Sequence, residues 1–426
     1  MRILVISKEA WRDEQNGGNV LTNMFSSFPD SEFAQMYCNE QEPNNTICRK
    51  YYQISDRMMV DSILHKTKAG REIIYDHVPT DTVATTESFK AAASKLGGNI
   101  KRILRELVWD MGKWNTHEIV SFAKAFNPDI IFAPCYGNHY MQKLTVMVHD
   151  AINKPVISYI SDDFYTNRQF RFSIIFWINH FFLRKRTRKT FKHYSLVYTM
   201  TDEQKAQCER DFGANMKILR KSGEFNARYL KNDVNTPIRF VYAGGIYLNR
   251  WKTLGALADA MRKINADGIK CVLDIYTNNP LTEQMQQAID DGLTVRVHKA
   301  VSMADLKDIY HHSDIALHVE SFDMVNRHAV RMSFSTKIID CMDSGCAVMA
   351  ICDKKQAGGA YLRRNDCAIC INNLSEIERT LNAIISNPQM LIEYQHKAFD
   401  IGSKYHLQEE ITRNLVNDFK DMINIR

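Results

Sequence analysis

Short apolar strand segments alternate with segments of helical periodicity along most of the 426-residue chain. The first half contains the candidate strands Arg2–Ser7, Glu32–Tyr37, Asp129–Ala133, Val156–Ile160 and Leu196–Met200. The second half repeats the pattern more regularly, at Phe240–Ala243, Val272–Tyr276, Val295–His298, Ile315–Val319, Ala347–Ile351 and Ala368–Ile371. Because strands that alternate with helices form parallel sheets covered by helices, the pattern predicts an α/β protein with two doubly wound, largely parallel sheets.

Helical periodicity fills most of the intervals between these strands. The predicted helices are Asn19–Phe28, Thr116–Phe126, Asp202–Phe212, Leu254–Ile264, Leu281–Asp290, Met303–His311, Lys337–Met342 and Ile377–Ile385. A polar stretch at 231–237 separates the two sets of strands. We therefore expect one domain over 1–234, a second over 235–404, and a C-terminal helix at about 405–426 that packs back on the first. The composition, 45% hydrophobic and 24% charged, excludes a disordered chain, a collagen-like fibre and a simple coiled coil.

Cysteine content and hydropathy indicate the cellular compartment of the protein. Ten cysteines in a chain of this length are too dilute for a disulfide scaffold. A secretory signal has a basic region followed by a long apolar stretch, but the chain begins with the short strand-like run Arg2–Ser7. We therefore expect no secretory signal. No run approaches the roughly 20 apolar residues of a membrane-spanning helix. These features lead us to expect a cytoplasmic protein.

Positive charge is concentrated in one segment. No carboxylate lies between Phe164 and Thr201, although eight basic side chains do: Arg168, Arg171, Arg184, Lys185, Arg186, Arg188, Lys189 and Lys192. The whole chain carries only +6, so a protein-wide nucleic-acid surface is not expected. Bulky apolar residues followed at once by cations, within 170–192, are typical of a helix that contacts the inner face of a membrane peripherally. The alternative is a helix packed on its own domain with a solvated basic end.

A glycine turn in the second half has the features of a phosphate-binding loop. Gly244 and Gly245 follow a buried strand, and a helix begins near Trp251. Glycines let the backbone approach an anion closely, while Arg250 and Lys252 supply charge and hydrogen-bond donors. The alternative reading is a plain turn with a solvated basic pair. The pattern favours a binding function over that reading.

Two further segments offer groups to the same ligand. Ser335 or Thr336 is expected to cap a helix whose first turn contains Lys337, a position where a cation opposes the helix dipole unless an anion is bound. Another strand delivers Glu320 and Ser321 at its carboxyl end, where a carboxylate can accept a hydrogen bond from a sugar hydroxyl. A solvated loop glutamate is the alternative reading of Glu320.

The second half resembles the GT-B glycosyltransferases, specifically the retaining glycosyltransferase family 4-like (glycosyl transferases group 1) superfamily, over about Arg239–Ile371. The resemblance is carried by the Gly244-Gly245…Arg250 turn, the strand end Glu320-Ser321-Phe322 and the stretch Asp340–Val348. It implies two Rossmann-like domains facing across a cleft, with the nucleotide-sugar donor held by the C-terminal domain. It also implies transfer with retention of anomeric configuration, in bacterial surface polysaccharide biosynthesis.

The resemblance assigns roles to individual residues. Arg250 or Lys252, together with Lys337, would contact the donor diphosphate. Glu320 would lie near the donor sugar, and Asp340 would bind the nucleotide ribose. Nineteen residues separate Glu320 from Asp340, more than is usual in the family, and the second position is an aspartate.

The first half contributes candidates for the acceptor side. Gly17 and Gly18 follow the first strand, close to where such proteins place the donor phosphates; a plain strand–helix turn is the alternative. Asp162 and Asp163 end another strand, and one of them could orient or deprotonate an acceptor hydroxyl. His139 follows a strand too and could contact the donor sugar, although a lone histidine is more often structural.

These observations together favour a glycosyltransferase that moves a sugar from a nucleotide-diphosphate sugar to a glycan or lipid-linked acceptor. Negative charge grows on the departing diphosphate, and cations and helix amides would stabilise it, so no metal or other cofactor is required. A non-catalytic sugar-nucleotide-binding protein or membrane scaffold of the same fold is the alternative. A dinucleotide oxidoreductase is disfavoured, because G-x-G-x-x-G is missing after the first strand.

Overall fold

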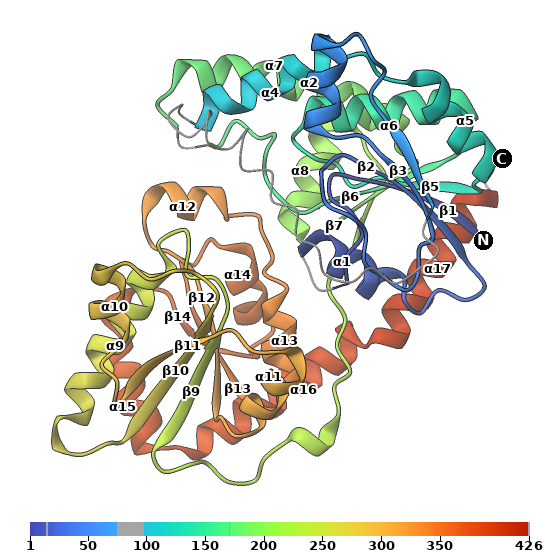
Figure 1. Ribbon diagram of the computed structural model, residues 1–426. Coiled ribbons are helices and arrows are strands. Elements are labelled where there is room, and N and C mark those ends of the chain that lie inside the picture. The colour runs from blue at the N-terminus through green and yellow to red at the C-terminus, as the bar shows by residue number, and fades with distance from the viewer. Residues whose placement is uncertain (14–15, 75–97, 170, 425–426) are drawn as a thin grey trace. The chain divides into compact units, whose positions relative to one another are not determined.

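A computed structural model describes residues 1–13, 16–74, 98–169 and 171–424. The chain divides into two compact units, which Figure 1 draws as two helix-covered sheets. Unit 1 contains residues 1–167, 171–219 and 412–426; unit 2 contains 168–170 and 220–411. The domains 1–234 and 235–404 proposed from the sequence have different bounds from these compact units and remain a proposal.

The sheet of unit 1 has eight strands in the order β4-β3-β2-β1-β5-β6-β7-β8. All neighbours pair parallel except β3 and β4. The strands are β1 (Arg2–Ser7), β2 (Glu32–Tyr37), β3 (Lys50–Gln53), β4 (Arg71–Ile74), β5 (Ile130–Phe132), β6 (Val156–Ile160), β7 (Leu196–Thr199) and β8 (Met216–Ile218). Apart from the edge strands β4 and β8, the central residues of these strands are almost completely buried, as near-continuous apolar runs in a two-sided parallel sheet require.

Helices cover both faces of this sheet (Figure 1). The helices of this unit are α1 (Asn16–Phe25), α2 (Asp56–Leu64), α4 (Gly98–Met111), α5 (Thr116–Phe126), α6 (His139–Ile152), α7 (Ile174–Thr190), α8 (Asp202–Phe212) and most of α17 (Gln408–Asn424). The last of these comes from the far end of the chain. Its Phe419 ring lies 5.9 Å from that of Phe25, and Tyr198 donates a 2.6 Å hydrogen bond to Asp418. Residues 425–426 of the predicted C-terminal helix lie outside the described residues.

The sheet of unit 2 has six parallel strands in the order β11-β10-β9-β12-β13-β14. The strands are β9 (Ile238–Ala243), β10 (Cys271–Thr277), β11 (Val295–Lys299), β12 (Ile315–Val319), β13 (Ala347–Ile351) and β14 (Ile369–Ile371). The helices are α9 (Arg250–Ile264), α10 (Glu283–Ile289), α11 (Met303–His311), α12 (Met324–Ala329), α13 (Lys337–Asp343), α14 (Ala357–Arg364), α15 (Ile377–Ser386) and α16 (Gln389–His406).

Each sheet contains one point at which the strand order reverses. In unit 1 the chain builds outward from β1 to β2 and β3 before returning to β5 on the other side of β1; in unit 2 the reversal falls between β9 and β12. Ligands of doubly wound sheets bind beyond the carboxyl ends of the strands at such a point. The topology therefore directs attention to the residues that follow β9 and β12.

The predicted class, two doubly wound and largely parallel sheets, is confirmed. Most predicted elements match within a few residues, but β3, β4, β8, α2, α4, α6, α12 and α14 were not predicted from the sequence. The helix after the first strand begins and ends three residues earlier than the expected Asn19–Phe28. Short strands escape prediction because three or four residues carry too little periodicity to distinguish them from loops.

Candidate functional site

The turn after β9 brings backbone and side chains together at the reversal point of unit 2. Gly244 has φ +155°, a conformation that side chains rarely adopt, and a Cβ built there would overlap the ammonium of Lys337. Tyr242 donates a 2.7 Å hydrogen bond to the Gly245 carbonyl, and Asn279 accepts one of 2.8 Å from the Ile246 amide. The glycine therefore serves one specific purpose, which is to let a lysine pass across the end of the strand.

Four residues after Gly244 the backbone is again unusual. Leu248 and Asn249 have φ +57° and +61°, in the left-handed region that non-glycine residues seldom occupy. Such conformations cost free energy and are concentrated at binding and catalytic sites. They direct the chain into α9 so that Arg250 is the first residue of that helix.

Lys337 begins α13 and reaches back over β9. Its Nζ atom lies 5.4 Å from the centroid of the Tyr242 ring, within the range of a cation–π contact. Burial, with a smaller contribution from the nearby charge of Arg250, lowers the pKa of this ammonium to about 8. A lysine held in such surroundings gains a partner when an anion binds.

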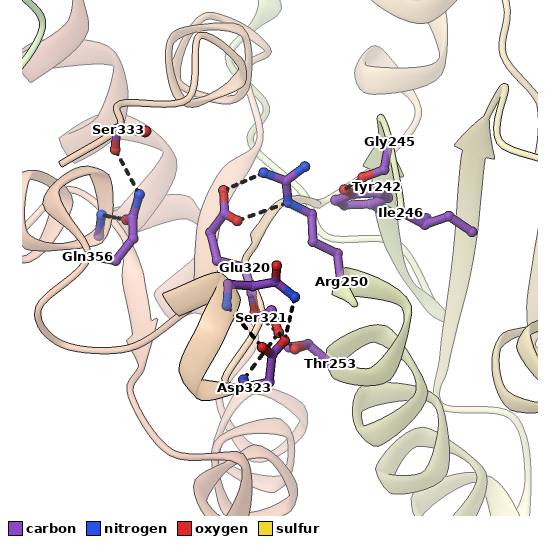
Figure 2. Close-up of polar contacts among 12 residues, drawn as sticks. Tyr242, Gly245, Ile246, Arg250, Thr253, Glu320, Ser321, Asp323, Ser333 and Gln356 are labelled. Atoms are coloured by element: carbon purple, nitrogen blue, oxygen red, sulfur yellow. Dashed lines mark hydrogen bonds and ion pairs between the residues drawn. The ribbon is translucent and has the colours of Figure 1, made fainter. Parts of the chain in front are cut away.

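Arg250 and Glu320 form a bidentate ion pair, which Figure 2 shows at the centre of the site. Nε and Nη2 of Arg250 donate to the two carboxylate oxygens at 2.9 and 3.0 Å. Burial opposes the arginine's charge, but the hydrogen bonds to Glu320 more than compensate and raise the pKa of Arg250. The guanidinium also lies 5.0 Å from the Tyr247 ring centroid. Because a guanidinium has five N–H donors, three remain that Glu320 does not engage.

The segment after β12 anchors this pair to the fold. Thr253 of α9 donates a 2.9 Å hydrogen bond to the Glu320 carbonyl, so the helix that carries Arg250 is fastened to the strand that delivers Glu320. Ser321 donates to Asp323, a residue that sequence reasoning missed. Burial opposes ionisation of Asp323, yet hydrogen bonds from Asn326, Ser321 and Asn249 lower its pKa to about 2. Asp323 is the N-cap residue of α12. An aspartate before a short helix was the sequence signal that could have identified it.

A buried histidine lies beneath the charged groups and was also missed. His318 of β12 is almost fully buried, and its Nε2 atom has no hydrogen-bond partner among the residues that the structure describes. Burial lowers the pKa of His318; Glu320 opposes the shift, while Arg250 and Lys337 add to it. The ring is therefore neutral at pH 7. A histidine within the otherwise apolar strand Ile315–Val319 was the sequence signal that could have identified it.

The other predicted donor residues occupy varied environments. Asp340 forms an ion pair with Lys221. Lys252 is exposed, with its Nζ atom 5.5 Å from the Trp251 ring centroid. Thr336 stands at the N-cap position of α13 but makes no side-chain capping hydrogen bond.

Local turn geometry corrects two expectations about hydrogen bonds. The helix cap predicted at Ser335 or Thr336 is wrong, because the first α13 amides bond to the carbonyls of these two residues instead. At α9, the amides of Arg250, Trp251 and Lys252 likewise donate to carbonyls of the preceding turn. At the start of α9, therefore, side chains rather than these three amides are the groups left to meet a ligand.

In unit 1 the predicted residues follow the strands around its own reversal point. Gly17 and Gly18 lie in α1, after β1. His139 begins α6, after β5; its Nδ1 atom lies 3.1 Å from Asp110, and its amide donates to Glu106 at 3.1 Å. Burial lowers the pKa of His139, and Arg186 adds to the shift.

The two aspartates that follow β6 differ in their surroundings. Asp163 is buried and accepts hydrogen bonds from the Thr166 amide at 3.0 Å and hydroxyl at 2.6 Å, the arrangement of a turn-forming aspartate. Asp162 is exposed. Of the pair, Asp162 is thus the better placed to meet a ligand.

Metal-binding geometry occurs elsewhere. Among the described residues, one group of histidine and carboxylate side chains has ligand atoms within 4.8 Å of one another: His149, Asp150 and His193. It lies at the end of α6 and in the short helix Phe191–His193, away from the turn after β9 in the sequence and in a different unit. The nine buried cysteines are free thiols, as is the half-buried Cys370.

Known proteins were compared with the chain at the levels of sequence and structure. No protein-family model matches the sequence, and no curated protein matches it. Sucrose-phosphate synthase from Thermosynechococcus elongatus is similar in structure, with a TM-score of 0.64 and 10% identity over 100% of both chains. Anabaena HepE in complex with UDP and glucose has a TM-score of 0.59 and 14% identity over 99% of this chain and 100% of its own.

A third similar structure is an alpha,alpha-trehalose-phosphate synthase (UDP-forming) from Burkholderia xenovorans in complex with glucose-6-phosphate. Its TM-score is 0.58, at 8% identity over 98% of this chain and 100% of that chain. These neighbours are GT-B glycosyltransferases. The chain has the GT-B fold. At such low identity the likeness concerns the fold alone, so the chemistry must be argued from the site.

Proposed function

We propose that this protein is a glycosyltransferase that takes a sugar from a nucleoside-diphosphate sugar bound by unit 2. The observation that carries the proposal is the convergence of Lys337 and Arg250 on the glycine turn after β9, with Gly244 leaving room for the ammonium. Both cations lie at the reversal point of a doubly wound sheet, where this architecture binds its ligands. The HepE structure is a complex with UDP and glucose, and the trehalose-phosphate synthase is described as UDP-forming; both support a nucleoside-diphosphate ligand.

The proposed chemistry follows from where charge develops. As the bond between the anomeric carbon and the diphosphate oxygen breaks, negative charge grows on the diphosphate. Lys337 and the N–H groups of Arg250 that Glu320 does not engage stabilise that charge, and Glu320 holds the guanidinium in place. Glu320 thus acts as a positioning residue for Arg250, in addition to the sugar contact implied by the resemblance. Asp340 remains the proposed ribose ligand, with Lys221 as its partner before binding.

The acceptor is proposed to be a glycan or a lipid-linked sugar, in bacterial surface polysaccharide synthesis. An acceptor hydroxyl bonds to the anomeric carbon and loses its proton, for which the exposed Asp162 is the candidate base. Retention of configuration and independence from metal belong to the same proposal. His139, held neutral, is the candidate contact for the donor sugar.

Binding and turnover separate this proposal from a scaffold of the same fold. The purified protein would be heated with a panel of nucleoside diphosphates and nucleotide sugars, since a ligand at 100 times its dissociation constant stabilises the fold by about 2.7 kcal/mol. Release of free sugar or diphosphate from the stabilising nucleotide sugar would then be followed. We expect both signals, and their loss in Lys337→Met. A protein that binds a nucleotide sugar but never turns it over, with any acceptor mixture, would support the scaffold instead.

A further inference from the structure

Helix α7 of unit 1 exposes an apolar face. Its residues Ile174, Ile175, Ile178, Phe181 and Phe182 recur at helical spacing and form one stripe. All five side chains are exposed, Ile174 to 77% and Phe181 to 64%. Phe172, just before the helix, is 89% exposed. Soluble helices normally bury such a stripe, so an exposed one indicates a binding surface.

The opposite face of α7 accounts for how the helix is held. His180, Leu183, Thr187 and Thr190 are buried. Gln142 of α6 donates to the Thr187 hydroxyl at 3.1 Å and accepts from that of Thr190 at 3.3 Å. The helix is therefore packed through its more polar side and presents its more apolar side outward. This orientation is the reverse of an ordinary surface helix.

Cations flank the apolar stripe. Lys185 and Lys189 follow Phe181 and Phe182 on the same side of the helix at a spacing of about one turn, and both are exposed. Within the described parts of the chain, neither these lysines nor Lys192 form an ion pair, whereas Arg184 is occupied by Asp211 at 2.9 Å. No carboxylate lies between residues 164 and 201 to compensate their charge.

A neighbouring helix also exposes apolar residues. Helix α4 packs beside α7, as Figure 1 shows, and exposes Leu104, Leu107 and Met111 at the same helical spacing. In the described residues no helix is both long and apolar enough to cross a bilayer. Contact with lipid would therefore have to occur along the side of α7 rather than through it. Residue 170, at the start of the segment 170–192, lies outside the described residues.

We propose that this surface, formed by the exposed residues of α7 and the lysines that follow them, docks on the headgroup layer of an anionic lipid bilayer. The aliphatic and aromatic side chains enter the interface, and Lys185 and Lys189 meet the lipid phosphates. A protein partner fits the charge pattern less well, because cores of protein interfaces are depleted in lysine. A nucleic acid would use the cations but leave the apolar stripe in water. The proposal does not depend on the reaction at the glycine turn.

Vesicle sedimentation of the full-length protein tests the docking surface. Phosphatidylcholine vesicles with and without phosphatidylglycerol would be compared at low and high salt. We expect binding to the anionic vesicles that weakens with salt, and that falls about 30-fold in the double variant Lys185→Ala/Lys189→Ala, since each lysine near the surface contributes about one factor of five. Lys124→Ala/Lys420→Ala removes the same charge from exposed positions on α5 and α17 and should bind like the unaltered protein.

A second pair of variants tests the apolar stripe at constant charge. Phe181→Ser/Phe182→Ser should lose most vesicle binding, whereas Ile269→Ser/Leu293→Ser, at exposed apolar positions in unit 2, should not. Equal binding by all four variants would overturn the proposal, as would no binding to either vesicle. Preferential binding of a single-stranded RNA over anionic vesicles would also overturn it. A further outcome would also overturn it: the protein binds no lipid but self-associates, and only Phe181→Ser/Phe182→Ser abolishes that association. The apolar face of α7 would then bind a second copy of the chain.

Discussion

Arg250 and Glu320 are seventy residues apart in the sequence and form a bidentate ion pair, with N···O distances of 2.9 and 3.0 Å. Arg250 follows strand β9, and Glu320 follows strand β12. Both side chains are largely withdrawn from solvent. A buried ion pair contributes little net stability. Removing one partner nevertheless lowers the free energy of unfolding by about 3–5 kcal/mol, because the other charge stays buried without compensation. This asymmetry makes the pair a suitable device for fixing a cation that a ligand later uses.

The first prediction concerns the stability of this pair. Glu320→Leu and Arg250→Met should each lower the free energy of unfolding by about 3 kcal/mol, because each leaves one buried charge without its partner. The loss of unfolding free energy in the double variant should be smaller than the sum of the losses in the two single variants. Urea denaturation followed by fluorescence and circular dichroism measures all three. Strict additivity would mean that the two side chains do not interact.

Lys337 supports a prediction about pH. Its pKa is lowered from 10.5 to about 8, chiefly by burial, so the folded protein releases this proton at a lower pH than the unfolded chain does. Between pH 8 and 10.5 the unfolded chain binds more protons, and this residue therefore adds stability as pH rises through that window. A bound diphosphate requires the charged form. Its affinity should consequently fall as pH rises from 7 to 9.

Lys337→Arg provides the control for that experiment, because a guanidinium stays charged throughout the range. Titration calorimetry with a nucleotide sugar, whose phosphates are fully ionised across it, measures the affinity at each pH. A decline in the unaltered protein and a flat profile in Lys337→Arg are expected. The same decline in both proteins would assign the pH dependence to another group.

Gly244 gives a prediction with a closely matched control. Gly244→Ala should abolish or strongly weaken diphosphate binding, because its Cβ would displace the Lys337 ammonium and its φ of +155° strains any side chain. Gly268→Ala has a similar strain, at φ +125°, but its Cβ would meet nothing within 4 Å. It should lose about 1 kcal/mol of stability and keep its affinity. Equal affinity in both variants would show that Gly244 does not make room for the lysine.

The structure also predicts how the fold responds to acid. His406 is buried at the end of α16, where its Nε2 atom lies 2.7 Å from the Tyr361 hydroxyl, and burial lowers its pKa to about 3, with a smaller contribution from Arg220. In the unfolded chain a histidine binds a proton near pH 6.5, whereas His406 in the folded protein stays neutral to a much lower pH. The free energy of unfolding therefore decreases as pH falls below 6.5. From pH 7.5 to 5.0, unfolding free energy should drop by about 2 kcal/mol more than in His406→Gln. An equal drop in both proteins would place the titration elsewhere.

The positions of the cations were accessible from the sequence, whereas their partners were not. Gly244 and Glu320 each follow a strand that alternates with helices, and parallel strands bring their carboxyl ends to one edge of a sheet. That rule suffices to group the glycine turn with Glu320. Pairing of Arg250 with Glu320 depends on side-chain rotamers across two elements, and periodicity carries no information about those. The same holds for Asp340 and Lys221, which are 119 residues apart.

Local polar structure was the least predictable part. A serine or threonine before a helix suggests a cap, but at Thr336 the backbone is already helical, so the hydroxyl is not directed at the first amides. The sequence signal for His318, one histidine in an apolar strand, marks an unusual core position but does not say what the ring contacts. Only the three-dimensional arrangement reveals that Arg250 and Lys337 act on its pKa.

The central claim is that Lys337 and Arg250 together bind a diphosphate leaving group. Titration calorimetry of the full-length protein and of Lys337→Met with a panel of nucleoside diphosphates tests it most directly, after both proteins are shown to unfold at similar urea concentrations. We predict saturable binding of at least one nucleoside diphosphate to the unaltered protein, and affinity about 10- to 100-fold weaker in Lys337→Met, as the loss of a charged hydrogen bond requires. Binding of no nucleoside diphosphate, or equal affinity in the two proteins, would contradict the claim.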